Sequence, residues 1–312
     1  MKINKLIYTL ALCLSVPALN ISAKDTEALP FIRIVRDPAS GAMGFAGVAS
    51  SSSIAYSSFN NPAMIPFFDK TGDIAFSYQN WAPDGVKSSN FNLGAGFKLF
   101  DGRLGFGFGG AFQNGEKYDT FNEAGVMTGS YTPNDMQINL GASSLITKEL
   151  SFGINLRYAK QSLSHDNASY ETVATDMFLA YRLNEFNFTA GLSSLGSSVK
   201  SASDEDFTIP TSATLGAEWH RTLAKEHGIK AVADFDYFFS DNVTAGFGAQ
   251  YSWKDMVFIR AGYHFGSDKA VLPSFLTLGG GIKHKRIRLD AAWLTGNDAI
   301  KNSLSLGLGI MF

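Results

Sequence analysis

The sequence predicts an all-β fold, a transmembrane antiparallel β-barrel of about 14 strands with an N-terminal plug-like segment in its lumen. From residue 72 onward, apolar residues alternate with polar or small ones in one segment after another. This period of two is that of a strand with one apolar face. The links between the segments alternate between short turns and long loops, and the last segment, SLSLGLGIMF, ends on an aromatic residue.

The composition narrows the fold to a membrane barrel or a large soluble β-sandwich. The 312 residues include 31 Gly, 26 Phe and 11 Tyr. Beyond the N-terminal segment, no apolar run approaches the roughly 20 residues that a membrane helix needs. The net charge of −2 and the lack of a basic cluster argue against a nucleic-acid partner.

Residues 1–23 are predicted to be a secretory signal peptide. Lys2 and Lys5 precede an apolar stretch, and small residues end it at Ala23. A membrane anchor is the alternative, but the stretch is short for a span and is broken by proline and asparagine. The single cysteine, Cys13, lies in this segment, so we expect a mature protein without disulfide or thiol chemistry.

Residues 24–71 do not alternate, and we expect them to fold into the lumen as a plug. Glycines among alanines and serines let the backbone pack closely there. Residues 52–59, SSIAYSSF, are expected to form a short helix that stops at Asn60-Asn61-Pro62, because proline drives the preceding residue out of helical geometry. A periplasmic tail is the alternative, but the segment's many apolar residues require burial. A barrel of this size otherwise encloses an aqueous channel.

Residues 72–312 are predicted to form the barrel, as fourteen alternating segments. Short turns on one side and long loops on the other are typical of outer-membrane barrels, whose turns face the periplasm. A soluble sandwich has no reason to sort its loops in this way. The short links are 101–102, 147–149, 184–185, 223–228, 254–255 and 284–285; the longer ones are 82–89, 114–135, 162–171, 196–210, 266–273 and 295–301, with 240–242 as the exception.

The final strand explains the aromatic end of the chain. Its leucines and Ile310 form one apolar face that can contact lipid, and Phe312 can lie at the membrane interface. A last strand ending in Phe also resembles the signal by which bacterial barrels are recognised for insertion. This resemblance places the protein in the outer membrane of a Gram-negative bacterium, with outer-membrane lipid as its surroundings.

The residues that alternate with the apolar face point into the lumen and include charges of both signs. The simpler interpretation is a salt-bridge lattice that stabilises the wall, because buried charges are costly unless paired. The alternative is a polar lining that contacts a ligand or plug. His220 and His264 also point inward and are interpreted as hydrogen-bonded wall residues rather than metal ligands. The charged set is Arg157, Asp176, Arg182, Glu218, Asp234, Asp236, Arg260, Lys283, Arg288 and Asp290.

Nothing in the sequence indicates an enzyme or a cofactor. Gly105, Gly107 and Gly110 have the spacing of a dinucleotide-binding motif. That motif needs a strand-to-helix turn, whereas here strand-phased phenylalanines fill the gaps and no helix follows. We interpret the glycines as places where the wall curves and leaves room inside.

The N-terminal segment resembles a known family. RDPASGAMGFAGVA and SSFNNPAMIPF, with the later YSWKDMVFIRAGYHF (251–265), are similar to sequences of the PorV/PorQ family, a branch of the fatty-acid-transporter-like (FadL-like) barrels. The resemblance implies fourteen strands, a luminal N-terminal segment and an origin in the Bacteroidetes. The matching residues are Arg36, Asp37, Ser40, Gly41, Met43, Gly44, Ala46, Gly47, Ala49, Asn61, Pro62 and Ala63.

The resemblance implies two competing roles, neither enzymatic. The first is a component of type IX-like protein secretion and surface attachment that binds secretion-system subunits or secreted proteins. The alternative is transport of hydrophobic small molecules across the outer membrane; a partner subunit without cargo of its own is a third. The residues expected to shape the plug, with ligand contact second, are Asp37, Gly41, Gly44, Gly47, Asn61 and Pro62. The loop 114–135, with Tyr118, Phe121 and Tyr131, is the candidate for partner contact.

Overall fold

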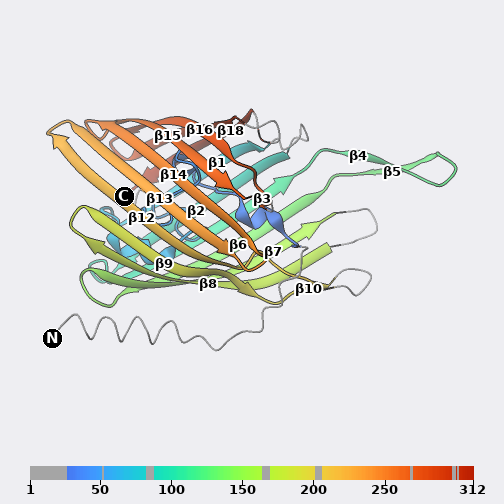
Figure 1. Cartoon of the computed structure of the whole chain (residues 1–312), viewed down its shortest axis with the longest axis horizontal. Coiled ribbons are helices and arrows are strands. Elements are labelled where there is room, and N and C mark those ends of the chain that lie inside the picture. Colours follow the sequence, from blue (N-terminus) through green and yellow to red (C-terminus); the bar gives the residue numbers. More distant parts are fainter. Residues whose placement is uncertain are drawn as a thin grey trace.

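The strands close into an antiparallel barrel, as predicted (Figure 1). Among the described residues, fourteen strands form this barrel. The structure is a computed structural model that describes residues 27–50, 53–81, 88–163, 169–200, 206–267, 270–296, 300 and 302–312. The predicted signal peptide lies outside these residues. The barrel strands are β1 (Gly72–Trp81), β2 (Ser88–Leu99), β3 (Leu104–Asn114), β6 (Asn134–Leu145), β7 (Leu150–Ser162), β8 (Ser169–Leu183), β9 (Phe186–Gly196), β12 (Ser212–Ala224), β13 (His227–Phe238), β14 (Asn242–Trp253), β15 (Val257–Gly266), β16 (Phe275–His284), β17 (Ile287–Thr295) and β18 (Ser303–Met311).

The barrel closes where its first strand meets its last. β1 pairs antiparallel with β18, from Asp73 opposite Met311 to Asn80 opposite Leu304. Gly72 and Phe312 extend this pairing with two backbone hydrogen bonds of 2.9 Å. Closure leaves no unpaired edge among the described strands of the barrel, which a sheet surrounded by lipid requires.

The two faces of the wall follow the predicted alternation. On β18, Leu304, Leu306, Leu308 and Ile310 are exposed on the outside, whereas Ser303 and Ser305 are buried. The outward phenylalanines and leucines of β2 and β3 show the same pattern. The outer surface is therefore an apolar belt. Among the described residues, no helix is long and apolar enough to cross a membrane.

Two of the long links contain short strands that the sequence did not predict. β4 (Tyr118–Phe121) pairs with β5 (Met127–Tyr131), and this hairpin projects well beyond the barrel (Figure 1). β10 (Val199–Lys200) pairs with β11 (Asp206–Phe207) in the link between β9 and β12. Both pairs are too short to give a clear period-two signal.

The segment before β1 fills the lumen, as predicted. It contains a 3₁₀ helix η1 (Pro30–Arg33), a single helical turn α2 (Pro38–Gly41) and a 3₁₀ helix η2 (Pro62–Phe67). At the loop end of the barrel, Leu29 and Phe31 pack in one cluster with Phe275. At the turn end, Ile54, Ile65 and Phe68 pack with Met311. The plug, defined here as residues 27–50 and 53–68, therefore extends along the length of the lumen.

The expected helix over residues 52–59 is wrong. Residues 54–60 make successive turns, with i→i+3 bonds such as the 3.0 Å one from the Phe59 N–H to the Tyr56 carbonyl. The helix starts at the proline instead of stopping before it. The Asn61 side chain accepts from the Ala63 N–H (2.9 Å) as an N-cap, and Pro62 occupies the first helical position, where its missing N–H costs nothing.

The glycine-rich strand β3 makes room for the plug. A Cβ at Gly105 would collide with the Ile65 side chain, and one at Gly109 would lie 2.7 Å from the Phe59 ring. At Gly107 it would be 3.2 Å from the Ser58 Cβ. Wall backbone and plug thus touch directly, which confirms the interpretation that these glycines leave space inside.

Candidate functional site

The plug turn α2 is fixed by Asp37 and by a chain of charges in the wall. Asp37 is the N-cap of α2 and accepts from the N–H groups of Ala39 (3.0 Å) and Ser40 (3.3 Å). Its carboxylate also lies 3.8 Å from Arg288 of β17. A cap of this kind contributes about 1 kcal/mol, and here it also connects the plug to the barrel.

The loop after α2 packs directly against the backbone of the wall strands. Gly44 has a φ of 70°, and its N–H donates to Thr277 Oγ1 of β16 (2.9 Å). A Cβ at Gly44 would lie 2.6 Å from the Phe247 carbonyl oxygen and closer still to that of Tyr263. Glycine therefore meets two demands at this position, a left-handed backbone and contact with two neighbouring strands.

Asp234 of β13 holds the next part of the plug. Its Oδ2 accepts from the backbone N–H groups of Gly47 (2.7 Å) and Val48 (2.8 Å). The Val48 carbonyl in turn accepts from Asn61 Nδ2 (2.8 Å). The N–H groups of an irregular buried loop need acceptors, and this wall carboxylate supplies one.

A buried arginine anchors the entry to α2. Arg36 donates to Asn90 Oδ1 of β2 (3.1 Å) and to the Phe31 carbonyl (2.9 Å). Its own carbonyl accepts from Ser77 Oγ (2.7 Å). Burial lowers the pKa of Arg36 to about 10, so the guanidinium stays charged at neutral pH.

All six plug residues predicted from the sequence lie inside the barrel, at three places along the plug. Asp37 and Gly41 bound the turn α2, and Gly44 and Gly47 belong to the loop that docks on β13–β16. Asn61 and Pro62 start η2 near β6 and β7. Their roles in plug geometry and ligand contact stay predictions.

Most of the predicted luminal charges form compact pairs in the wall. Arg157 donates to Asp176 (2.7 Å), and Glu218 pairs with Lys230 (2.8 Å). Asp290 accepts from both Arg260 and Arg288 at 2.7 Å. The Arg182 guanidinium lies over the Phe67 ring of the plug. The role of these charges as a lattice that stabilises the wall stays a prediction.

Lys283 and His220 were predicted to point into the lumen, but their side chains are partly exposed to solvent. Lys283 lies at the turn end of the barrel and pairs with the exposed Asp255. The His220 side chain is half exposed and lies 3.4 Å from Glu218. Both occupy strand ends, where the inward phase no longer guarantees burial. His264, by contrast, is buried and stacks on Phe275 with ring centroids 4.8 Å apart.

The wall is irregular where β8 meets β9. The register shifts between Thr175 and Met177, and Ser194 takes a positive φ of 55°. Asp176 accepts from the Ser194 N–H (2.6 Å), and Arg157 donates to Ser194 Oγ (2.9 Å). This β-bulge turns Ser193 and Ser194 toward the lumen. The doublet of serines interrupts the alternation, and this was a signal in the sequence that the prediction overlooked.

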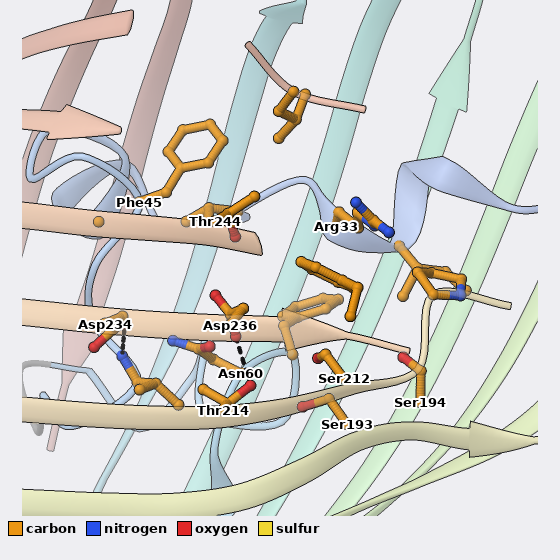
Figure 2. A pocket seen from close by; sticks show the side chains of 18 of the residues that line it. Arg33, Phe45, Asn60, Ser193, Ser194, Ser212, Thr214, Asp234, Asp236 and Thr244 are labelled. Carbon is orange, nitrogen blue, oxygen red and sulfur yellow. Dashed lines mark hydrogen bonds between the residues drawn. The ribbon is translucent and has the colours of Figure 1, made fainter. Parts of the chain in front are cut away.

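A cavity of about 140 Å³ lies between the plug and the wall strands β7 to β15. Figure 2 shows polar side chains gathered on one side of it, among them Asn60, Ser193, Ser212, Thr214 and Asp236. The remaining lining includes the charged or polar Arg33, Arg157, Asp234, Thr244 and His264 as well as the apolar Ile32, Phe45, Val48, Phe59, Phe178, Phe238 and Leu272. Arg157, Asp234, Asp236 and His264, which also line the cavity, were predicted to face the lumen; Ser193, Ser212 and Thr214 were not identified from the sequence.

The groups that line this cavity are suited to binding a ligand. Among the described residues, no group of three His, Cys, Asp or Glu side chains is placed to hold a metal ion. The cavity instead offers hydroxyl, amide and carboxylate groups beside aromatic rings. Such a lining is suited to a small ligand with an apolar body.

Comparisons with known proteins show the fold. No protein-family model matches the chain, and no curated protein matches its sequence. Among solved structures, the Pseudomonas putida toluene transporter TodX has a TM-score of 0.64 at 15% identity, covering 89% of this chain and 99% of its own. The Ralstonia pickettii toluene transporter TbuX has a TM-score of 0.62 at 12% identity, covering 88% and 98%. The monoaromatic hydrocarbon channel CymD has a TM-score of 0.64 at 13% identity, covering 88% and 97%.

The chain is thus similar in fold, over 88–89% of its length, to transporters and a channel of solved structure. At these identities the likeness concerns fold. The narrower resemblance to the PorV/PorQ family, and the Bacteroidetes origin that it implies, stay predictions.

Proposed function

We propose that the protein carries small, largely apolar molecules across the outer membrane of a Gram-negative bacterium. This is the alternative role that the sequence resemblance implies, and the similarity in fold to toluene transporters and a hydrocarbon channel favours it over the secretion role. The apolar belt and the plugged lumen suit an outer-membrane barrel that gives water no open channel.

The observation that carries the proposal is the cavity beside the plug. Its volume of about 140 Å³ is similar to that of an engineered protein cavity, about 150 Å³, that binds benzene. Phe45, Phe178 and Phe238 supply aromatic surface along it. It is therefore large enough for one aromatic ring.

Uptake of labelled toluene tests this function. The protein is expressed in a Gram-negative host whose lipopolysaccharide layer excludes apolar molecules, and uptake is compared with that of cells carrying an empty vector. Ser212→Met places a larger side chain from β12 into the cavity and should lower uptake severalfold. Leu215→Met, on the lipid-facing side of the same strand, is the matched control and should behave as wild type. Uptake equal to the empty vector, or unaffected by Ser212→Met, would refute the proposal.

The location is tested by fractionation. We expect the protein in the outer-membrane fraction, with faster migration on a denaturing gel before boiling than after. Recovery in the aqueous fraction would contradict a membrane barrel.

The projecting hairpin favours the secretion role as a second candidate. Phe121, Val126 and Met127 at and near its tip are 62%, 59% and 53% exposed, and the Tyr118 and Tyr131 rings contact each other at its base. Because the apolar tip of the β4–β5 hairpin lies beyond the barrel, it can contact another protein, such as a secreted chain or a secretion-system subunit. Purification in mild detergent with mass spectrometry tests this role. The co-purified protein should disappear when residues 116–132 are replaced by a short glycine–serine link; unchanged co-purification would refute the assignment of the hairpin.

A further inference from the structure

The cavity has a polar side that a hydrocarbon would leave without partners. Asn60 of the plug and Asp236 of β13 both line this side of the cavity (Figure 2). Among the described residues, no protein group hydrogen-bonds the side chains of Asn60, Ser193 or Ser212, although all three line the cavity. Covering such groups with an apolar molecule costs free energy, because their bonds to water are lost and not replaced.

Asp236 is the strongest acceptor of this group. Thr214 Oγ1 donates to its Oδ1 (2.5 Å), and a carboxylate has room for about four donors in all. The two arginines of the cavity are committed elsewhere, Arg33 to Glu27 and Arg157 to Asp176. Among the described residues, no lysine, arginine or histidine nitrogen lies within 4.0 Å of Asp236. Arg33, which lines the same cavity, acts on Asp236 electrostatically, but it does not pair with it directly, so the Asp236 carboxyl keeps acceptor positions toward the cavity.

Apolar side chains in the lining of the cavity are suited to an aromatic ring. Phe45 packs edge-on against Phe275, with centroids 5.1 Å apart, and Phe178 is fully buried in the wall. Both side chains line the cavity with Val48. An aromatic ring here gains apolar contact, while a substituent on it can reach the polar side.

We propose that this cavity selects single aromatic rings that carry a hydrogen-bond donor, a hydroxyl or amino group, over plain aromatic hydrocarbons. The ring packs between Phe45 and Phe178, and the donor bonds to the Asp236 carboxylate, with Asn60 and Ser212 beside it. The inference rests on the proposed transport function and specifies its substrate class. A hydrogen bond to a charged partner is among the stronger ones in proteins, so the preference is large enough to measure.

Toluene, phenol and aniline test the preference, because they have the same shape and differ only in a methyl, hydroxyl or amino group. The full-length barrel is placed in lipid nanodiscs, and binding of each labelled compound is measured by equilibrium dialysis against empty nanodiscs. We expect phenol and aniline to bind about tenfold more tightly than toluene. Anisole, which has an oxygen but no donor, should bind like toluene.

Asp236→Asn tests the assigned acceptor. The amide has the shape of the carboxylate but lacks its charge, so the ratio of phenol to toluene affinity should fall from about tenfold to within about threefold. Glu171→Gln makes the same chemical change at an exposed position of β8, where the carboxylate meets Tyr158, and should leave the ratio unchanged. If Asp236→Asn does not fold, Ser212→Met serves instead and should abolish binding of phenol and aniline.

The outcomes separate this inference from the transport proposal. Equal binding of toluene, anisole and phenol, or a phenol preference that Asp236→Asn leaves intact, overturns the inference while transport of apolar molecules stands. Phenol binding that survives Ser212→Met overturns the assigned place. Failure of all four compounds to bind the wild type overturns both.

Discussion

Replacing Gly44 with alanine tests how closely the plug fits the barrel wall. Two effects act on the new side chain. A non-glycine residue in the left-handed region, where Gly44 has its φ of 70°, costs about 1–2 kcal/mol. The added Cβ would also lie 2.6 Å from the Phe247 carbonyl oxygen, and overpacking of this kind costs about 1–3 kcal/mol.

Together these effects weaken docking of the plug by about 2–5 kcal/mol. Since each 1.4 kcal/mol changes an equilibrium tenfold, the undocked population should rise by at least about twentyfold. The lumen behind the plug is lined with polar side chains such as Asn90, Asn139 and Asn155. An undocked plug therefore opens a path for water and small solutes.

The assay is conductance in planar bilayers, with sugar flux into proteoliposomes as a second readout. Gly41→Ala is the matched control, three residues earlier in the same plug. Its Cβ would lie 3.6 Å from Ala292 Cβ, an ordinary contact, and alanine is the better helix former. Gly44→Ala should conduct, and Gly41→Ala should stay closed. Migration on unboiled gels confirms that both barrels are folded. A folded Gly44→Ala barrel with wild-type conductance and flux would refute the close fit of plug and wall.

Three further predictions concern the plug, the wall and assembly. Asn61→Ala removes the N-cap of η2 and a bond to the plug backbone, and should weaken the plug by about 2–3 kcal/mol, seen as faster hydrogen exchange there with the barrel strands unchanged. Asp290→Asn leaves the buried Arg260 and Arg288 without their shared carboxylate and should lower the free energy of unfolding in urea by about 3–5 kcal/mol; a loss below about 1 kcal/mol would show that the pairs contribute little. Phe312→Ser keeps the backbone bonds to β1 but removes the terminal aromatic group, and should reduce the folded, heat-modifiable fraction in cells severalfold; normal assembly would exclude Phe312 from the insertion signal.

The strands and the faces of the barrel could be predicted from the sequence because both depend on local information. In a strand, the period of two assigns each side chain to a face without knowledge of its neighbours. The turn at Asp101-Gly102 and the final strand ending at Phe312 were located in this way. For residues near strand ends, such as Lys283 and His220, burial was predicted but the side chains are partly exposed. Burial there depends on how far the barrel wall extends.

The plug could be predicted only in outline. Apolar residues without alternation indicated a buried segment, but the helix was placed over residues 52–59 instead of from Pro62. The same Asn-Pro pair can end one helix or begin another, and local sequence does not decide between them. Contact with β6 and β7, where η2 packs, decides it in the structure.

The sequence by itself determined the closed all-β architecture, the apolar outer face and the set of charges that point inward, because period and turn chemistry are properties of neighbouring residues. The tertiary structure decided which of these charges pair, and it left Asp236 facing a cavity while Asp290 is enclosed by two arginines. It also made Asn60 of the plug line the same cavity as Ser212 and Asp236 of the wall. These residues are far apart in the chain, and only closure of the barrel around the plug brings them together.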